Sequence, residues 1–193
     1  MENNKLNAKD LIRVGIITVL YFVAFFISGM LGYIPIFVVI LPFILGILGA
    51  LPFMYLVTKT SKFGAITILG TLASILCFFM GQHWISIPFG FAFGFIGDLI
   101  IKSGDYKSWK KIVIGYAFFT EWVIGSMLPM WIMRDVFFEK YKAVGEEYMQ
   151  AVKNLTSNYM LPVIIILGFV GAIIGAYIGK ALLNKHFKRG GII

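Results

Sequence analysis

Apolar residues of this chain fall into six long runs separated by short polar links. The runs cover residues 11–31, 34–57, 64–80, 85–101, 111–133 and 159–183. About twenty apolar residues are needed for an α-helix to cross the hydrocarbon core of a bilayer. The pattern therefore predicts an all-α, polytopic membrane protein with six transmembrane helices in a single domain, residues 1–193.

The composition agrees with a membrane protein and excludes most soluble classes. Hydrophobic residues make up 60% of the 193 residues and charged residues 13%, with a mean hydropathy of +0.90. Soluble domains of this size carry about 25% charged residues. The first run is too long for a signal-peptide core, and no small-residue cleavage pattern follows it, so we expect a retained helix.

Lysine and arginine are concentrated in alternate links between the runs. The links GYIP and GQHW carry none, whereas the N-terminal segment, the TKTSK link, residues 102–111 and the C-terminal tail are basic. Basic loops stay on the cytoplasmic side. We therefore expect both termini in the cytoplasm of a multi-pass protein of the cell (plasma) membrane. In a membrane protein the distribution of charge matters more than the net charge, here +8, and no nucleic-acid partner is expected.

The remaining link, residues 134–158, is long, has no net formal charge and is expected on the extracellular side. Its apolar residues recur at spacings of mostly three and four, which predicts an amphipathic helix lying on the outer surface. Two interpretations stay open at this point. The helix is either a packed surface element or a lid over a site that opens outward.

Motifs for catalysis and nucleotide binding are absent from the sequence. There is no phosphate loop ending in Gly-Lys-Ser/Thr, no HExxH motif and no GxSxG motif. The two histidines, His83 and His186, are expected on opposite sides of the membrane, and Cys77 is the only cysteine. We expect neither an enzyme nor a resident metal site.

Glu121 is the most informative single residue, because it falls near the middle of the fifth run. A carboxylate in lipid is costly and usually faces the protein interior. It either makes a structural hydrogen bond or takes part in substrate binding or coupling. Eight residues later, Pro129 removes a helix hydrogen bond, which with Gly125 and Ser126 predicts a polar notch. The nearby methionines, Met130 among them, favour adaptable packing over metal binding.

Polar residues at the two ends of the fourth run have separate expected roles. Gln82, His83 and Trp84 lie in the outer link, where His83 is either exposed or binds substrate, including a haem iron. Asp98 lies four residues before Lys102, which predicts a local ion pair.

Glycines recur at helical spacing in the fourth and sixth runs. This spacing predicts close helix packing within the bundle, or else an interface with a partner subunit. The glycines are Gly90, Gly94, Gly97, Gly168, Gly171, Gly175 and Gly179.

Over nearly its whole length the chain resembles the substrate-binding S components of energy-coupling factor (ECF) transporters. Chain length, six spans, basic cytoplasmic termini and the lack of an ATPase are shared, and the opening KLNAKDLIRVGIITVLYFV is similar. More narrowly, the GQHW turn, the PFGFAFGFIGDLI span and the long fifth loop resemble the Trep_Strep group. The resemblance implies an ABC importer subunit for micronutrient uptake. It would capture a vitamin-like or haem-like molecule outside and deliver it with a coupling subunit and two ABC ATPases.

The resemblance also implies where ligand and partners bind. The pocket of these proteins opens near the outer face, which implies these substrate-binding candidates: Gln82, His83, Trp84, Glu121, Gly125, Ser126, Met130 and Tyr159. Haem would be a transported substrate, and no intrinsic cofactor is implied. The family's first helix docks on the coupling subunit through a small-residue AxxxA face. The matching positions are Gly15 and Val19 with Thr18 beside them, although Val19 is not small; Asp98 is a further partner-interface candidate.

Two other functions are alternatives to this one, namely metal-ion import and stand-alone transport. Nickel and cobalt members of the family carry an N-terminal histidine segment, and MENNKLNAKD has none, so metal-ion import is disfavoured. The alternative function is a stand-alone ion- or proton-coupled secondary transporter or channel that uses Glu121. The absence of an inverted repeat speaks against that alternative.

Overall fold

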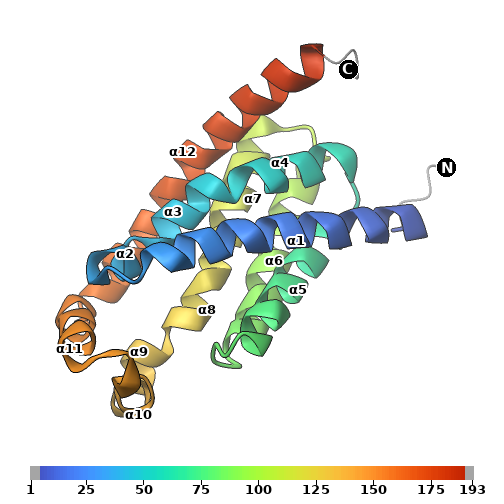
Figure 1. Ribbon diagram of the computed structural model, residues 1–193. Coiled ribbons are helices and arrows are strands. Elements are labelled where there is room, and N and C mark those ends of the chain that lie inside the picture. Colours follow the sequence, from blue (N-terminus) through green and yellow to red (C-terminus); the bar gives the residue numbers. More distant parts are fainter. Residues whose placement is uncertain (1–4, 190–193) are drawn as a thin grey trace.

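Residues 5–189 are described by a computed structural model, and this part of the chain is all helical, without a strand (Figure 1). Each predicted run corresponds to one helix or to a string of consecutive helices. In chain order the elements are α1 Ala8–Leu31, α2 Pro35–Val39, α3 Leu41–Leu48, α4 Ala50–Lys59, α5 Ala65–Phe79, α6 Ser86–Lys102, α7 Trp109–Thr120, the 3-10 turn η1 Glu121–Val123, α8 Ile124–Met127, α9 Pro129–Ile132, α10 Arg134–Lys140, the 3-10 turn η2 Lys142–Val144, α11 Glu146–Leu155 and α12 Met160–Arg189.

Three helical segments within residues 5–189 are long and apolar enough to cross a bilayer, namely Ala8–Leu31, Trp109–Ile132 and Met160–Lys185. The bent pair α3–α4 is a fourth if it is counted as one span. With 15 and 17 residues, α5 and α6 fall short of the roughly twenty residues that a span needs. Length and composition thus support three or four spans, fewer than the six predicted runs.

The second run is not one continuous helix. It is divided into α2, α3 and α4, and the chain bends by 42° between α3 and α4 at Gly49. Each proline of the run lies in the first turn of its own helix, where the missing N–H has no helical partner to lose. The bend near Pro52 falls at Gly49, just before the first turn of α4.

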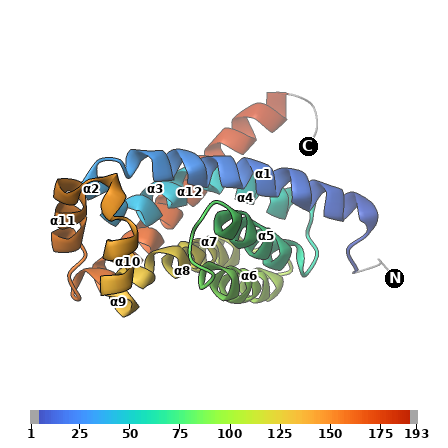
Figure 2. The ribbon, with the colours of Figure 1, turned by 60° about the horizontal axis from the view of Figure 1, so that its bottom comes forward.

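The segment α7 occupies the centre of the bundle. It packs against α6 on one side and against α12 on the other, while α1 crosses α5, α3 and α4 (Figures 1 and 2). Most residues of Trp109–Ile132 are buried, whereas α1 and α12 leave apolar side chains on the outside. This distribution is the one expected when lipid surrounds the outer helices.

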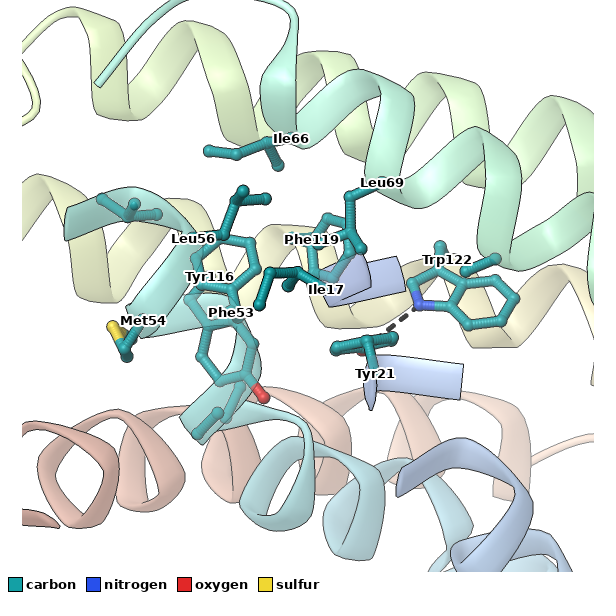
Figure 3. Close-up of a cluster of buried hydrophobic side chains, with 14 of the residues drawn as sticks. Ile17, Tyr21, Phe53, Met54, Leu56, Ile66, Leu69, Tyr116, Phe119 and Trp122 are labelled. Carbon is teal, nitrogen blue, oxygen red and sulfur yellow. Dashed lines mark hydrogen bonds between the residues drawn. The ribbon is translucent and has the colours of Figure 1, made fainter. Parts of the chain in front are cut away.

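An aromatic cluster joins α7 to α1 and α4 (Figure 3). The Nε1–H group of Trp122 donates to the Tyr21 hydroxyl at 3.3 Å, and the ring centroids of Tyr21 and Phe119 lie 5.3 Å apart. Phe53 packs against Tyr116 with centroids 4.5 Å apart, and the Tyr116 hydroxyl donates to the Gly46 carbonyl at 2.8 Å. The polar atoms of these large side chains are therefore satisfied inside the bundle.

Glycines bring α3 and α12 into backbone contact. A Cβ atom at Gly46 would overlap the backbone of Gly171 and Ala172, and one at Gly175 would overlap the Gly46 carbonyl. A Cβ at Gly171 would likewise meet the backbone of Phe43. The interpretation of these glycines as packing residues within the bundle is confirmed, because only hydrogen fits between the two helices.

The amphipathic segment 134–158 is divided into α10 and α11. Gly145 separates them with φ +130° and ψ 130°, a conformation open to glycine and far from a helix. Phe138, Met149 and Val152 turn inward and are buried. The amphipathic pattern is confirmed and the single continuous helix is wrong. Both helices lie at the end of the bundle away from the two chain ends (Figure 1).

Asp98 does not form the predicted ion pair with Lys102. Its carboxylate is fully buried and accepts from the Gly64 N–H at 2.7 Å, and from the N–H and hydroxyl of Thr67 at 3.2 and 3.0 Å. The Lys102 ammonium lies over the Phe63 ring instead, 4.6 Å from its centroid. Asp98 thus caps the N-terminus of α5 from a neighbouring helix, because those N–H groups have no partner within α5.

Tyr106, which follows α6, completes this cap. Its hydroxyl donates to the second carboxylate oxygen of Asp98 at 3.1 Å. Burial, together with the nearby carboxylate, raises the pKa of Tyr106 and keeps its hydroxyl a donor. All four hydrogen bonds to Asp98 come from inside the protein, so its location in the bundle offers no exposed carboxylate to a partner.

Candidate ligand-binding site

A cavity of about 400 Å³, called the chamber below, lies beneath α10 and α11. Its walls come from the ends of α1, α2, α3 and α5, from the turn before α6, and from α8 and α9. The lining residues are Phe25, Phe26, Gly29, Met30, Gly32, Tyr33, Val38, Leu41, Met80, Gln82, Ser126, Met127, Met130, Phe137, Tyr141, Val144, Tyr148, Met149 and Val152. This volume lies within the range of small-molecule sites, about 300–1,000 Å³.

The lining of the chamber is rich in aromatic and thioether groups and contains no ionisable acid, lysine, arginine or histidine. Flexible methionine side chains fill irregular gaps and contact aromatic rings favourably. The few polar groups are Gln82, Ser126 and three tyrosines. The Ser126 hydroxyl already donates to the Val123 carbonyl at 2.7 Å. The chamber is therefore suited to an apolar, ring-containing molecule with few hydrogen-bonding groups.

A smaller cavity of about 60 Å³, called the annex below, adjoins the chamber. Four residues line both cavities, namely Gln82, Ser126, Phe137 and Tyr141. The annex differs in chemistry, since His83 and Lys140 also line it. The remaining lining residues are Pro129, Met133 and Val136. Hydrogen-bond donors are thus placed beside a largely apolar chamber.

Two tyrosines fasten the roof of the chamber to the helices below. The Tyr148 hydroxyl, from α11, donates to the Gly32 carbonyl in the α1–α2 turn. The Tyr141 hydroxyl donates to the Gly81 carbonyl in the α5–α6 turn at 3.3 Å. Burial raises the pKa of Tyr148, which keeps the hydroxyl protonated as a donor. The roof is therefore held at two turns by single neutral hydrogen bonds.

The roof is held more firmly where the start of α10 meets the end of α11. The Arg134 guanidinium donates to the carbonyls of Thr156 and Lys153 at 2.7 and 2.5 Å, and Trp131 Nε1 donates to the Ser157 carbonyl at 3.1 Å. Hydrogen bonds from a charged donor are stronger than neutral ones. If the roof opens, the tyrosine side is the weaker one.

We expect Tyr148→Phe to loosen α11 without unfolding the bundle. The substitution removes one hydroxyl and leaves the Gly32 carbonyl without this donor, a loss of about 1 kcal/mol. Amide hydrogen exchange over residues 146–155 should become faster by several-fold, while exchange in α7 stays unchanged. The matched control is Tyr159→Phe, because Tyr159 is 73% exposed. Equal protection of α11 in both variants would contradict the role of Tyr148 as a fastening residue.

The structure brings together four of the predicted substrate-binding residues. Gln82 and Ser126 line both cavities, His83 lines the annex, and Met130 lines the chamber. These residues come from the α5–α6 turn and from α8 and α9, which are more than forty residues apart in sequence. The polar notch predicted before Pro129 lies here, because α8 ends at Met127 and Pro129, which has no N–H group, begins α9.

The other four candidates lie outside the cavity walls. Glu121 is buried in η1 against Gly168 of α12, and neither of its carboxylate oxygens has a hydrogen-bond partner among the groups that the structure describes. Gly125 packs against Phe89 of α6. Trp84 and Tyr159 are exposed. Their roles in binding stay predictions.

The partner-interface candidates of α1 divide between two faces of the helix. Val19 is 56% exposed, and the space around the Gly15 Cα is open. Thr18 instead faces the bundle, where its hydroxyl donates to the Val14 carbonyl at 2.8 Å. Gly15 and Val19 can therefore meet a neighbouring protein or lipid directly, and Thr18 cannot.

Several chamber residues were missed by reasoning from the sequence. They include Phe25, Tyr33, Tyr141, Tyr148 and Met149. The amphipathic pattern of 134–158 predicted an apolar face turned toward the bundle, and this pattern could have indicated the cavity-lining residues of α10 and α11. No comparable signal marks the end of α1, because its apolar residues surround the whole helix.

Among the side chains that the structure describes, no three histidine, cysteine or acidic groups lie close enough together to hold a metal ion. His83 is the one nitrogen ligand at the two cavities, and its Nδ1 accepts a long hydrogen bond from the Ile85 N–H at 3.4 Å. Methionine sulfurs are weak additional ligands.

Apolar helices surrounding a chamber with a two-helix roof define an integral membrane protein whose candidate site lies at one end of the bundle. Residues 8–189 match the model of a family described as "Hypothetical bacterial integral membrane protein (Trep_Strep)", and the chain therefore belongs to this family. The resemblance to the Trep_Strep group is thereby confirmed. No curated protein and no solved structure matches the chain.

Proposed function

We propose that the protein is the substrate-capture subunit, or S component, of an ECF-type importer in the cell membrane. It binds a vitamin-like or haem-like molecule at the extracellular side and delivers it with a coupling subunit and two ABC ATPases. The observation that carries this proposal is the roofed chamber of about 400 Å³, placed at the end of the bundle away from both chain ends. A capture protein for a small molecule needs a concave, largely apolar site of this kind.

The proposal includes six membrane crossings with both termini in the cytoplasm. The basic residues outside the segment 134–158 lie on links that this topology puts inside. In this arrangement α5 and α6 are short spans, which the bilayer accommodates by local thinning. The chamber, α10 and α11 then face the extracellular side.

The source of energy lies outside this chain in the proposed mechanism, because the sequence carries no phosphate loop. A ligand shifts a conformational equilibrium only through different affinities for the two states. The substrate therefore binds the outward state better, and ATP use on the partner subunits reverses that preference. Haem as cargo is supported by His83 and the methionine thioethers, which are ligand types of haem iron.

Co-purification tests the capture-subunit proposal. Tagged protein, co-expressed with an ECF coupling subunit and its two ATPases, is expected to retain all three through purification. Val19→Trp should reduce the retained amount several-fold, because it adds bulk to the exposed face of α1. The control is Ile166→Trp on α12, where the side chain is similarly exposed at 61%. Complete lack of association in the wild type would contradict the proposal.

The second candidate function is a stand-alone ion- or proton-coupled transporter or channel. The buried Glu121 carboxyl group favours it, because neither oxygen has a hydrogen-bond partner among the described residues. Reconstitution in liposomes separates the two functions. Proton flux through the protein alone, lost in Glu121→Gln, would favour the transporter, whereas no flux without the partner subunits would favour the capture subunit.

A further inference from the structure

We infer that the ligand is a flat, largely apolar molecule with a single anionic group, and that this group is held at Lys140 and His83 in the annex. This inference rests on the proposed function and narrows its substrate class to a vitamin-like acid rather than haem, because the Nε2 atom of His83 cannot both ligate a haem iron and donate to an anion. It follows from the contrast between the two cavities, which share four lining residues and differ in charge.

The chamber itself has no place for an ionic group. None of its lining side chains is an acid, lysine, arginine or histidine. An ion moved from water to such surroundings without a partner loses several kcal/mol of solvation free energy. The part of the ligand that fills the chamber must therefore be uncharged.

The walls of the chamber favour rings over flexible chains. Aromatic side chains are contributed by α1, by the α1–α2 turn and by the roof, and methionines by α1, the α5–α6 turn, α8, α9 and the roof. Rings interact with other rings and with thioethers through specific, favourable edge and face contacts. The aromatic residues are Phe25, Phe26, Tyr33, Phe137, Tyr141 and Tyr148, and the methionines are Met30, Met80, Met127, Met130 and Met149.

Lys140 is a cation without an acidic partner in the described part of the chain. Its ammonium lies 5.2 Å from the centroid of the Tyr141 ring. The neighbouring Glu139 pairs with Lys142 instead, at 3.4 Å. The positive charge beside the annex is thus available to an anion from outside the chain.

His83, from the α5–α6 turn, supplies a second donor to the annex. Its Nδ1 faces the Ile85 N–H, which leaves Nε2 as the nitrogen that can donate to a ligand. The annex volume of about 60 Å³ is enough for a group the size of a carboxylate, roughly twice the volume that a water molecule takes in the liquid. Gln82 lies between the two cavities and can contact both parts of one molecule.

Matched pairs of aromatic acids and amides test this inference. The probes are 2-naphthoate with 2-naphthamide and biphenyl-4-carboxylate with its carboxamide, titrated calorimetrically into the full chain. The protein is held in nanodiscs of phosphatidylcholine, and empty nanodiscs correct for partitioning of the probes. At least one carboxylate is expected to bind about tenfold more tightly than its amide, as for a charge-assisted contact.

The variant Lys140→Gln should abolish this preference and leave the affinity for the amide unchanged. The matched control is Lys142→Gln, on the same segment but outside both cavities, and it should keep the preference. The inference is overturned if acid and amide bind equally to the wild type, if Lys140→Gln weakens both equally, or if none of the probes binds.

Failure of this inference is distinguishable from failure of the proposed function. Association with the coupling subunit and ATPases is measured on the same preparation and needs no ligand. Retained association without a preference for the acid overturns the ligand class alone, whereas lost association contradicts the capture-subunit role.

Discussion

Gly175→Val is expected to destabilise the protein by about 3 kcal/mol or more, because it separates α12 from α3. Gly175 faces the carbonyl of Gly46 and the Cα of Ile47 so closely that even one Cβ atom has no room. The obstructing atoms are backbone atoms, which cannot rotate away as a flexible side chain can. The valine variant must move one helix and break contacts along both. Thermal unfolding in detergent, followed by size-exclusion chromatography, measures the loss.

Gly15→Val is the matched control for this prediction. Gly15 also lies in the interior of a long helix, but no heavy atom lies within 4 Å of the position that its Cβ would occupy. Helix propensity changes by the same amount in both variants, and valine is no worse than glycine there. The midpoint of unfolding should therefore stay close to that of the wild type. Equal stabilities of the two variants would show that α3 and α12 are not packed at backbone contact.

Asp98→Ala is expected to cost about 3 kcal/mol by removing the cap of α5. The N–H groups of Gly64 and Thr67 would lose their acceptor, as would the hydroxyls of Thr67 and Tyr106. A buried donor without a partner costs about 1–3 kcal/mol, and partial access to water reduces the total. The first turn of α5 should fray, which amide hydrogen exchange over residues 64–70 would detect together with a lower unfolding midpoint.

Substitutions by asparagine distinguish the effect of losing the cap from the effect of losing a negative charge. Asp98→Asn keeps one oxygen acceptor and should have about half the effect of alanine. Asp105→Asn removes the same charge from an exposed turn residue at φ 50°, a conformation that asparagine tolerates, and should change stability by less than about 0.5 kcal/mol. If Asp98→Ala is as stable as the wild type, the four hydrogen bonds do not contribute and the capping role is wrong.

The candidate site could be predicted only in part, and the reason differs from residue to residue. Gln82 and Ser126 were found because polar residues within or beside apolar runs are few. Glu121 carried the same signal, yet it lies behind the chamber walls against Gly168. The rarity of a polar residue in a membrane helix shows that it has a role, but the rotation of the helix decides which surface it faces.

Asp98 shows that the spacing of two residues in the sequence does not decide whether they contact each other. The spacing of Asp98 and Lys102 allows an ion pair on one helix face. Only the packing of α6 against α5 brings unpaired N–H groups within 2.7–3.2 Å of the carboxylate. Several hydrogen bonds in a buried place stabilise the carboxylate more than one exposed lysine can.

The sequence by itself determined that the protein is helical, that it belongs to a membrane family, and that the fifth run is disturbed before Pro129. Lipid leaves backbone N–H and C=O groups no partner outside the chain, so long apolar runs must be helical, and a proline removes one helix hydrogen bond. The tertiary structure alone decided the break at Gly145, the contact of α3 with α12 and the walls of the chamber. Those features depend on how helices rotate and approach one another, which is set by side chains from several segments packing at once.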